Sequence, residues 1–448
     1  MNMSAVAPRV VITGYGIVSP LGNSPESYWN ALRQGHSGVT ALGPPYEFLP
    51  TKVAGQAREF TGDIANFGEM EKTLQRTVKK GLKLMCRDIQ MGVAAGQLAI
   101  NHAKLSTGSS DPQVQRERIG VLYGCDHILS IPEEFVDGIK ACLNSEGKFD
   151  FSLWPEKGLP KVDPLWLLKY LPNMPACHMA IYHDLHGPNN SLTVREASSN
   201  MALTEALCTV ARGSADVMIV GGTGSRIHTS RSVHLALQEQ IAVGEVNETD
   251  PLAAGRACRP FAADRSGMVL AEGAGAIVLE TEAHAKARGA QVLGTIVAGS
   301  SAAVADSRGV PNFRRAFEIV IKSLLRQTGL SATDIGHVNA HGLGTISCDQ
   351  QEAEAIEAVL GPEVPVVAAK SYIGNLGAGG GMVEAIASLL SLQHGELFRT
   401  INCEQRDPAC RINVVNRPGV APGRCFINLN ITPQGQASAV LIGDANFG

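Results

Sequence analysis

The stretch SLTVREASSN, residues 191–200, places a carboxylate where α/β enzymes often present a nucleophile. "SLTV" is typical of a strand, and a helix with apolar residues at helical spacing begins directly after the "REASS" turn. At such a helix start the backbone N–H groups of Ala197, Ser198 and Ser199 lack intrahelical partners and could bind an anion or a developing oxyanion. The residue at the apex is Glu196. A purely structural interpretation also fits the turn, with Glu196 stabilised by the helix dipole and a serine capping the helix.

Three other stretches place chemically useful side chains at the ends of strands, where open α/β sheets carry their sites. "NAHGLGT" (339–345) ends in His341, and "AAKSYIGNLGAGGG" (368–381) has Lys370 after a strand and Asn375 before a glycine run. Each of these residues alone could equally be a satisfied loop residue. In the third stretch, residues 259–280, Asp264 and Arg265 are interpreted as an ion pair within a structural hairpin.

The elements that must hold these residues form two successive α/β halves. Strand patterns at 9–13, 118–123, 191–194, 215–220 and 273–280 alternate with helical ones, and the alternation resumes after residue 289. With no Pro/Ser-rich linker between them, the halves 1–288 and 289–448 indicate one internally duplicated fold. Residues 126–172 mix polar and aromatic positions and are interpreted as an inserted cap.

Composition restricts the class of protein. Of 448 residues 18% are charged and the net charge is −4, which argues against a nucleic-acid partner and favours a small molecule or a protein. Ten isolated cysteines without a C-x-x-C pair or a nearby His cluster predict reduced thiols and no metal site. No signal peptide and no apolar run near the roughly 18 residues of a membrane span is seen, so we expect a cytoplasmic protein that does not enter a membrane.

Together and in this order, the motifs resemble the β-ketoacyl-acyl-carrier-protein synthases, the elongating condensing enzymes of fatty-acid and polyketide assembly. The resemblance also includes "RVVITGYGIVSPLG" (9–22) and "ADVMIVGG" (215–222), and it spans nearly the whole chain. It implies an α/β thiolase-type fold of two duplicated halves in five layers, α-β-α-β-α, and a dimer. It also implies no cofactor, since the substrates are acyl and malonyl thioesters on an acyl-carrier protein.

The resemblance places Glu196 at the family's nucleophilic cysteine. Counting without a gap from Gly187 forward and from Gly213 backward gives the same assignment. A thiolate exchanges acyl thioesters at comparable energy, whereas a carboxylate would have to form a far more reactive mixed anhydride. Of the family's two histidines, His341 is present and the second falls on Asn375, whose amide could still hydrogen-bond a thioester oxygen.

Other family positions are kept or altered. Lys370 matches the family's lysine, and Asp349 and Glu352 follow the first histidine as in the family. The family's glycine- and phenylalanine-rich acyl gate is not recognisable in "NITPQGQ" (430–436), where Thr432 falls near the second phenylalanine. By resemblance, the substrate-binding positions are Ala197, Ser198 and Thr432, beside the catalytic positions 196, 341, 370 and 375.

Three functions remain open. The first is a non-condensing pseudo-synthase similar to chain-length-factor subunits, which carry a glutamine at this position. It would act as a homodimer or beside a cysteine-bearing paralogue. The second is a malonyl-carrier-protein decarboxylase that uses His341 and Asn375, with Glu196 protonated. The third is an active acyltransferase with another nucleophile, Ser198 or Cys177.

Overall fold

The computed structural model describes residues 8–108, 115–247, 249–250 and 252–447. Most of its strands join one mixed sheet of 11 strands in the order β11-β10-β9-β12-β13-β8-β1-β7-β6-β4-β5. The first half of the chain supplies β1 (Val10–Val18), β4 (Ile119–Cys125), β5 (Asn189–Leu192), β6 (Val217–Ser225) and β7 (Glu272–Thr281). The second supplies β8 (Gly294–Ala303), β9 (His337–Asn339), β10 (Pro365–Val367), β11 (Asn413–Val414), β12 (Cys425–Ile431) and β13 (Gln436–Gly443).

The two halves of the sheet repeat one strand pattern, as a duplicated fold requires. In the first half, β4 pairs in parallel with β5 and β6, and β6-β7-β1 continue antiparallel. In the second half, β9 pairs in parallel with β10 and β12, and β12-β13-β8 continue antiparallel. The halves join where β1 pairs with β8. The predicted internal duplication is therefore present in the strand order itself.

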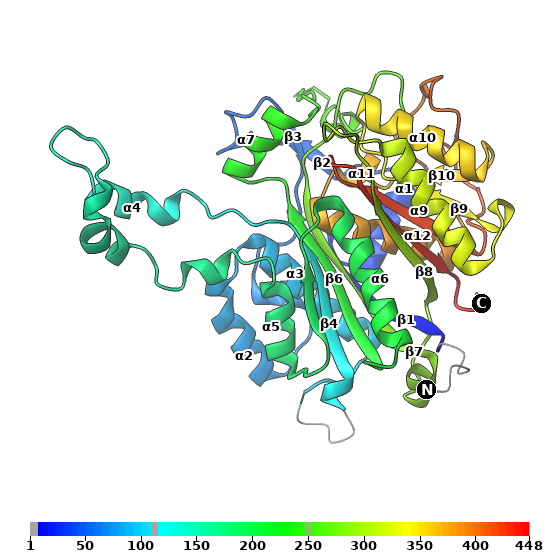
Figure 1. The fold of residues 1–448 in the computed structure, drawn as a ribbon, viewed down its shortest axis with the longest axis horizontal. Helices are drawn as coiled ribbons and strands as arrows, with labels where there is room; N and C mark the ends of the chain where they lie inside the picture. The colour runs from blue at the N-terminus through cyan, green and yellow to red at the C-terminus, as the bar shows by residue number, and fades with distance from the viewer. Residues whose placement is uncertain (1–7, 109–114, 248, 251, 448) are drawn as a thin grey trace.

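The two halves of the sheet form two layers, and helices form the other three (Figure 1). α6 (Ser198–Ala211) contacts β4 and β6 of one half and β8 and β13 of the other, and α12 (Gly380–His394) likewise contacts β6, β7 and β12. These two helices are the middle layer. α3 (Arg87–Ala103) and α5 (Met174–His183) cover the outer face of the first half, and α9 (Phe313–Thr328) with α10 (Ile346–Leu360) covers that of the second. The predicted five layers are confirmed.

The remaining elements are shorter or lie at the edges. A small antiparallel pair, β2 (Val39–Ala41) and β3 (Val53–Gly55), stands apart from the main sheet. The other helices are α1 (Pro25–Gln34), α2 (Lys72–Gly81), α4 (Glu133–Ala141), α7 (Thr229–Gln238), α8 (Glu282–Ala287) and α11 (Lys370–Ile373). None of the helices in the described ranges is long and apolar enough to cross a membrane.

The insertion at 126–172 does not lie over the sheet of its own chain as the predicted cap would. It leaves the end of β4 and extends away from the body as an arm that carries α4 (Figure 1). Large apolar side chains are exposed along it, because the arm is too thin to bury them. They are Ile131, Ile139, Leu143, Phe149, Phe151, Leu159, Leu165 and Leu167.

The interpretation of Asp264 and Arg265 as an ion pair with each other is wrong. Arg265 is buried and donates to Asp407 at 2.7 Å, with Asp349 3.7 Å away, whereas Asp264 pairs with Arg259. The two neighbouring side chains leave the backbone toward different segments. Arg265 thereby joins this stretch to the segment that follows His341.

Candidate functional site

The predicted site residues converge between the two halves of the sheet. Glu196 lies in a 3₁₀ turn (Arg195–Ala197) that leads directly into α6, and His341 follows β9. Lys370 begins α11, and Asn375 lies in the loop between α11 and α12. All four are almost fully buried, with exposed fractions of 1 to 2%. Strand ends and helix starts from both halves therefore meet at one enclosed point, as sequence reasoning predicted.

Glu196 is held by two donors. Its Oε1 accepts a hydrogen bond from Arg226 Nη2 at 2.6 Å and from Asn375 Nδ2 at 3.2 Å, and Arg195 Nε lies 3.5 Å from Oε2. Burial alone would raise the pKa of Glu196, but the positive charges of Arg226 and then Arg195 bring it down to about 2. Glu196 is thus a carboxylate at neutral pH. This arrangement argues against the protonated Glu196 of the decarboxylase hypothesis.

The turn engages two of the three backbone donors that the sequence left free, and the N–H of Ser198 donates to Arg195 O. The N–H of Ala197 donates to Val194 O at 3.1 Å, and the hydroxyl of Ser198 accepts from Val194 N at 2.8 Å. Ser199 donates to Ala378 O. Both serine side chains are thus engaged within the backbone of the site. The Ala197 N–H is likewise unavailable as an oxyanion donor in this arrangement.

His341 is positioned by carboxylates on α10. Glu352 accepts from the N–H groups of His341 at 2.6 Å and Gly342 at 2.9 Å, and Asp349 accepts from those of Leu343 and Gly344 at 3.0 Å. These bonds satisfy a loop that turns sharply after β9, so they fix where the imidazole lies. This explains the two acidic residues that the sequence places after the histidine.

The imidazole of His341 is neutral. Its Nδ1 lies 3.4 Å from Lys370 Nζ and 3.5 Å from Asn430 Nδ2. Burial and then the charge of Lys370 hold the pKa of His341 well below its ordinary value of 6.5. Since both neighbours are donors, Nδ1 is the acceptor and the proton resides on Nε2. Nε2 is buried and, like Arg226 Nε and Arg195 Nε, has no hydrogen-bond partner among the described residues.

Lys370 is paired with an acid of its own. Its ammonium group contacts Glu384 on α12, and Asn430 Nδ2 also donates to Glu384 at 2.7 Å. All three side chains are fully or almost fully buried. Lys370 therefore acts on His341 through its charge and orientation, not as a free amine.

The remaining predicted residues lie at different distances from this centre. Thr432 is buried just after β12, the strand that packs against the Glu196 turn, and its N–H donates to Gln436 O at 3.0 Å. Cys177 lies on α5 in the outer layer, where Asn173 donates to its sulfur at 3.4 Å. It is not brought to Glu196.

Sequence reasoning missed two charged residues, Arg226 and Asp126. They follow β6 and β4 directly, and their closest side-chain atoms lie 3.5 Å apart. The position of each after a buried strand was the signal that could have found them. Arg231 and Asp88 extend this buried network, with Arg231 Nη1 3.8 Å from Asp126 and 3.6 Å from Asp88.

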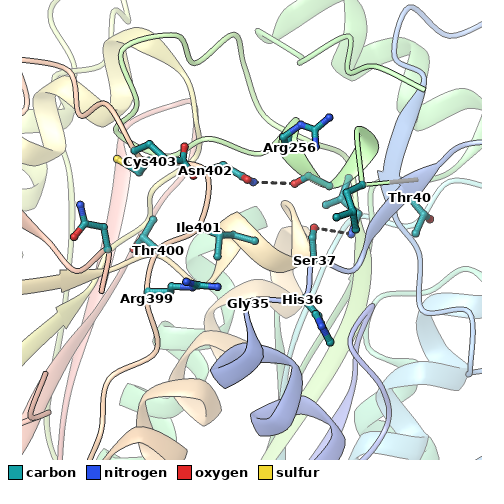
Figure 2. A pocket seen from close by; sticks show the side chains of 15 residues that line it. Gly35, His36, Ser37, Thr40, Arg256, Arg399, Thr400, Ile401, Asn402 and Cys403 are labelled. Atoms are coloured by element: carbon teal, nitrogen blue, oxygen red, sulfur yellow. Dashed lines mark hydrogen bonds between the residues drawn. The ribbon is translucent and has the colours of Figure 1, made fainter. Parts of the chain in front are cut away.

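A cavity of about 590 Å³ lies elsewhere, between residues 35–40, 252–256 and 399–404 (Figure 2). None of the four central site residues lines it. On one wall Asn402 donates to Gly255 O at 2.8 Å, and Thr400 accepts from Ala368 N at 3.0 Å. The cavity thus adjoins the segment leading to Lys370 without opening on Glu196. In the described ranges no three His, Cys, Asp or Glu residues are grouped to hold a metal ion.

Comparisons with known proteins agree with this architecture. The model of the β-ketoacyl synthase N-terminal domain matches residues 7–285, and that of the C-terminal domain matches residues 293–404. The chain is 31% identical to the 3-oxoacyl-[acyl-carrier-protein] synthase 2 of Synechocystis sp. over 91% of each chain. It is 30% identical to the chloroplastic synthase I of Hordeum vulgare over 91% of this chain and 82% of that one.

Solved structures show the same fold at lower identity. The ishigamide ketosynthase/chain length factor superposes with a TM-score of 0.79 at 24% identity, covering 99% of this chain and 100% of that one. A β-ketoacyl synthase from Burkholderia phymatum superposes with a TM-score of 0.81 at 24% identity, covering 98% and 99%. Family models that match most of the chain, together with the curated relatives, show that the chain belongs to the β-ketoacyl synthase family of fatty-acid and polyketide biosynthesis.

Proposed function

We propose that this chain is a non-condensing β-ketoacyl synthase homologue that serves as the partner subunit of a cysteine-bearing paralogue. The observation that carries the proposal is the state of Glu196, a buried carboxylate that accepts from both Arg226 and Asn375. It stands at the position assigned by resemblance to the family's cysteine. A carboxylate with a pKa of about 2 is a weak nucleophile, and its acyl product would be an anhydride.

The charge of Glu196 also argues against the partial reaction. Release of carbon dioxide from a malonyl thioester requires a bound carboxylate and a donor for the thioester oxygen. An ionised Glu196 repels that carboxylate, and the Asn375 amide already donates to Glu196. The chain therefore lacks both the nucleophile and one of the two donors on which the family's chemistry depends.

A malonyl-carrier-protein decarboxylase is the second candidate, and one observation favours it. His341 is neutral, and the proton on its Nε2 has no acceptor among the described residues. Such an N–H could bind a thioester oxygen. The third candidate, an acyltransferase through Ser198 or Cys177, has less support because Ser198 is engaged by Val194 and Cys177 lies in the outer layer.

Acyl-carrier protein remains the expected partner for docking. Five basic side chains on and just after α2 are exposed, and no ion pair joins any of them to another described residue: Lys72, Arg76, Lys79, Lys80 and Lys83. Such a basic helix would attract an acidic partner. One solved relative, at 22% identity, is a type II ketosynthase in complex with its acyl-carrier protein.

The proposed contact with the paralogue lies at the β5 edge. β5 is the last strand of the sheet, so one side of its backbone is unpaired, and the apolar arm at 126–172 begins at the adjacent strand β4. Unpaired strand edges and exposed apolar side chains are both stabilised by a second chain. By resemblance, the family pairs its subunits at this edge.

Co-expression with a cysteine-bearing paralogue tests the proposal. We expect light scattering to show a heterodimer, and the complex to condense acyl and malonyl groups only while the paralogue keeps its cysteine. This chain alone should form no ketoacyl product. Condensation by this chain alone, or by a complex whose paralogue carries Cys→Ala, would contradict the proposal. A chain that remains monomeric with and without the paralogue would contradict the partner role.

A further inference from the structure

The two donors to Glu196 come from segments that are rigid without it. Arg226 directly follows β6, and its guanidinium is 4% exposed and 3.5 Å from Asp126. Asn375 is fixed by its own backbone, since its N–H donates to Val269 O at 2.8 Å and its O accepts from Ala271 N at 3.1 Å. Both donors reach the same atom, Glu196 Oε1. They form a small cradle for one carboxylate oxygen, and Glu196 Oε2 has no hydrogen-bond partner among the described residues.

A glycine makes room for the arginine in this cradle. Gly377 has a φ of +62°, and a Cβ there would lie 2.7 Å from Arg226 Nε and 2.1 Å from the Asp126 carboxylate. Asp126 is held in turn by the N–H of Ala378 at 3.3 Å. The guanidinium is thus enclosed from behind, and its open side faces Glu196.

Glu196 is the nearest counter-ion of Arg226 in this network, at 2.6 Å, whereas Asp126 lies 3.5 Å away. Asp126 is also approached by Arg231, at 3.8 Å. The other two arginines have partners of their own, Arg195 in Glu239 and Arg231 in Asp88 at 3.6 Å. Without Glu196, the buried Arg226 would therefore lose its hydrogen-bonded counter-ion and keep only the more distant Asp126.

We propose that Arg226 and Asn375 form a receptor for a small monocarboxylate, and that the side chain of Glu196 is its resident ligand. The contact is autoinhibitory, because the internal carboxylate occupies the place that the carboxylate of an incoming substrate would take. It also gives a reason for glutamate rather than glutamine at this position. An amide would still present an acceptor to Arg226 but would carry no charge, which would leave Asp126 as the nearest counter-ion of Arg226.

The autoinhibitory role of the occupied site rests on the proposed function, but the carboxylate receptor does not. The receptor and the proposed function can therefore fail separately. Carboxylate binding to the receptor can be measured without catalytic turnover. If the receptor is disproved, the non-condensing role still stands on the missing thiolate. If the parent chain condenses acyl groups, the proposed function fails but the receptor can still be real.

Ligand replacement tests the receptor. Glu196→Ala removes the internal carboxylate and leaves Arg226 and Asn375 in place. We expect E196A to melt at a lower temperature than the parent. Sodium formate should raise its melting temperature in a saturable way, well beyond sodium chloride at equal ionic strength. Formate is the probe because it has the two carboxylate oxygens and little more. The parent, and E196Q in which the amide fills the space, should respond equally to both salts.

The double variant E196A/R226M separates a receptor from a general salt effect. It removes the guanidinium that would bind the anion while Asp126 keeps Arg231 as a counter-ion, so formate should act on it no more than chloride. An equal formate effect in E196A and the double variant would overturn the proposal, as would a folded E196A that formate does not stabilise. If E196A does not fold in chloride, recovery of folded E196A by formate supports the proposal, and no recovery by formate overturns it.

Discussion

Glu196 Oε1 and Arg226 Nη2 lie 2.6 Å apart at a point where both side chains are at most 4% exposed. One residue lies in the turn that leads into the middle-layer helix and the other directly follows a strand of the first half, so the pair ties the start of α6 to the end of β6. Breaking one partner of such a buried pair costs more than the pair itself contributes, because the other charge remains buried. The pair therefore governs both the chemistry of the site and its stability.

Glu196→Gln should make the protein less stable at neutral pH and less sensitive to acid. The pKa of Glu196 is about 2 in the folded protein and 4.5 ordinarily, so the unfolded chain binds this proton more tightly. The ionised Glu196 stabilises the folded state fully above pH 4.5, and this stabilisation is lost as the pH falls toward 2. It amounts to on the order of 3 kcal/mol. Urea unfolding of parent and E196Q between pH 7 and 2.5 measures this difference.

Glu280→Gln is the matched control for this experiment. The pKa of Glu280 is also lowered to about 2, against the effect of burial, by its bonds to Arg288, His284 and Thr13. Glu280 lies on β7 away from the candidate site, so E280Q should show a similar loss of stability without changing carboxylate or thiol chemistry at position 196. Stability curves of E196Q and parent that stay parallel from pH 7 to 2.5 would contradict an ionised Glu196.

His341 should stay neutral, with its proton on Nε2, from pH 8 down to pH 5. Nitrogen-15 NMR of labelled histidine distinguishes the tautomers, and the H341A spectrum assigns the signals. Lys370→Met removes a positive charge 3.4 Å from Nδ1, so it should raise the pKa of His341 toward 6.5. A signal from His341 that titrates near pH 6.5 in the parent would show that Lys370 and burial do not control the imidazole.

The general architecture could be predicted from the sequence because its signals are local and repeated. Alternating strand and helix patterns, and a chain that repeats them after residue 289, were sufficient for the duplicated α/β fold. The positions of Glu196, His341, Lys370 and Asn375 at strand or helix ends were also sufficient to bring them together. Each of these inferences depends on periodicity or on where an element stops.

The electrostatics of the site could not be predicted in this way. Whether Glu196 is ionised depends on Arg226, which is 30 residues away and is fixed by Asp126 and Gly377 from two other segments. Arg265 likewise prefers Asp407 to its neighbour Asp264 because its side chain turns inward. Charge pairing in the interior is set by tertiary packing. The course of the 126–172 arm depends on contacts that a local pattern does not encode.

Glu196→Cys should create a reactive thiol. Arg226 and the start of α6 would favour the thiolate, so the pKa of the new cysteine should fall below the ordinary value of about 8.5. Burial shifts the pKa of native thiols in the opposite direction, and it raises the pKa of Cys258 to about 12. We expect peptide mass spectrometry to show that iodoacetamide modifies residue 196 at pH 7 faster than the buried native cysteines.

The exposed Cys208 serves as the internal reference for reagent access in that experiment, and E196C/R226M serves as the matched variant. Loss of the guanidinium should slow labelling at position 196 while leaving Cys208 unchanged. Labelling of E196C no faster than that of Cys258, with Cys208 fully modified, would show that the pocket is closed to small reagents.

Glu196→Gln should also restore part of a decarboxylation site. The substitution removes the charge that repels a malonyl carboxylate and adds an amide donor, while the Nε2–H of His341 can bind the thioester oxygen. We expect little or no carbon dioxide from the parent and a gain of about tenfold or more over background in E196Q, which corresponds to roughly 1.4 kcal/mol in the barrier. Release of labelled carbon dioxide from malonyl-acyl-carrier protein measures this gain.

The gain should disappear in E196Q/H341A, because His341 supplies the remaining donor. If E196Q binds malonyl-acyl-carrier protein yet releases no more carbon dioxide than the parent, His341 and Asn375 do not form a surviving decarboxylation site. Of the decarboxylase and the non-condensing partner subunit, the geometry would then support only the partner subunit.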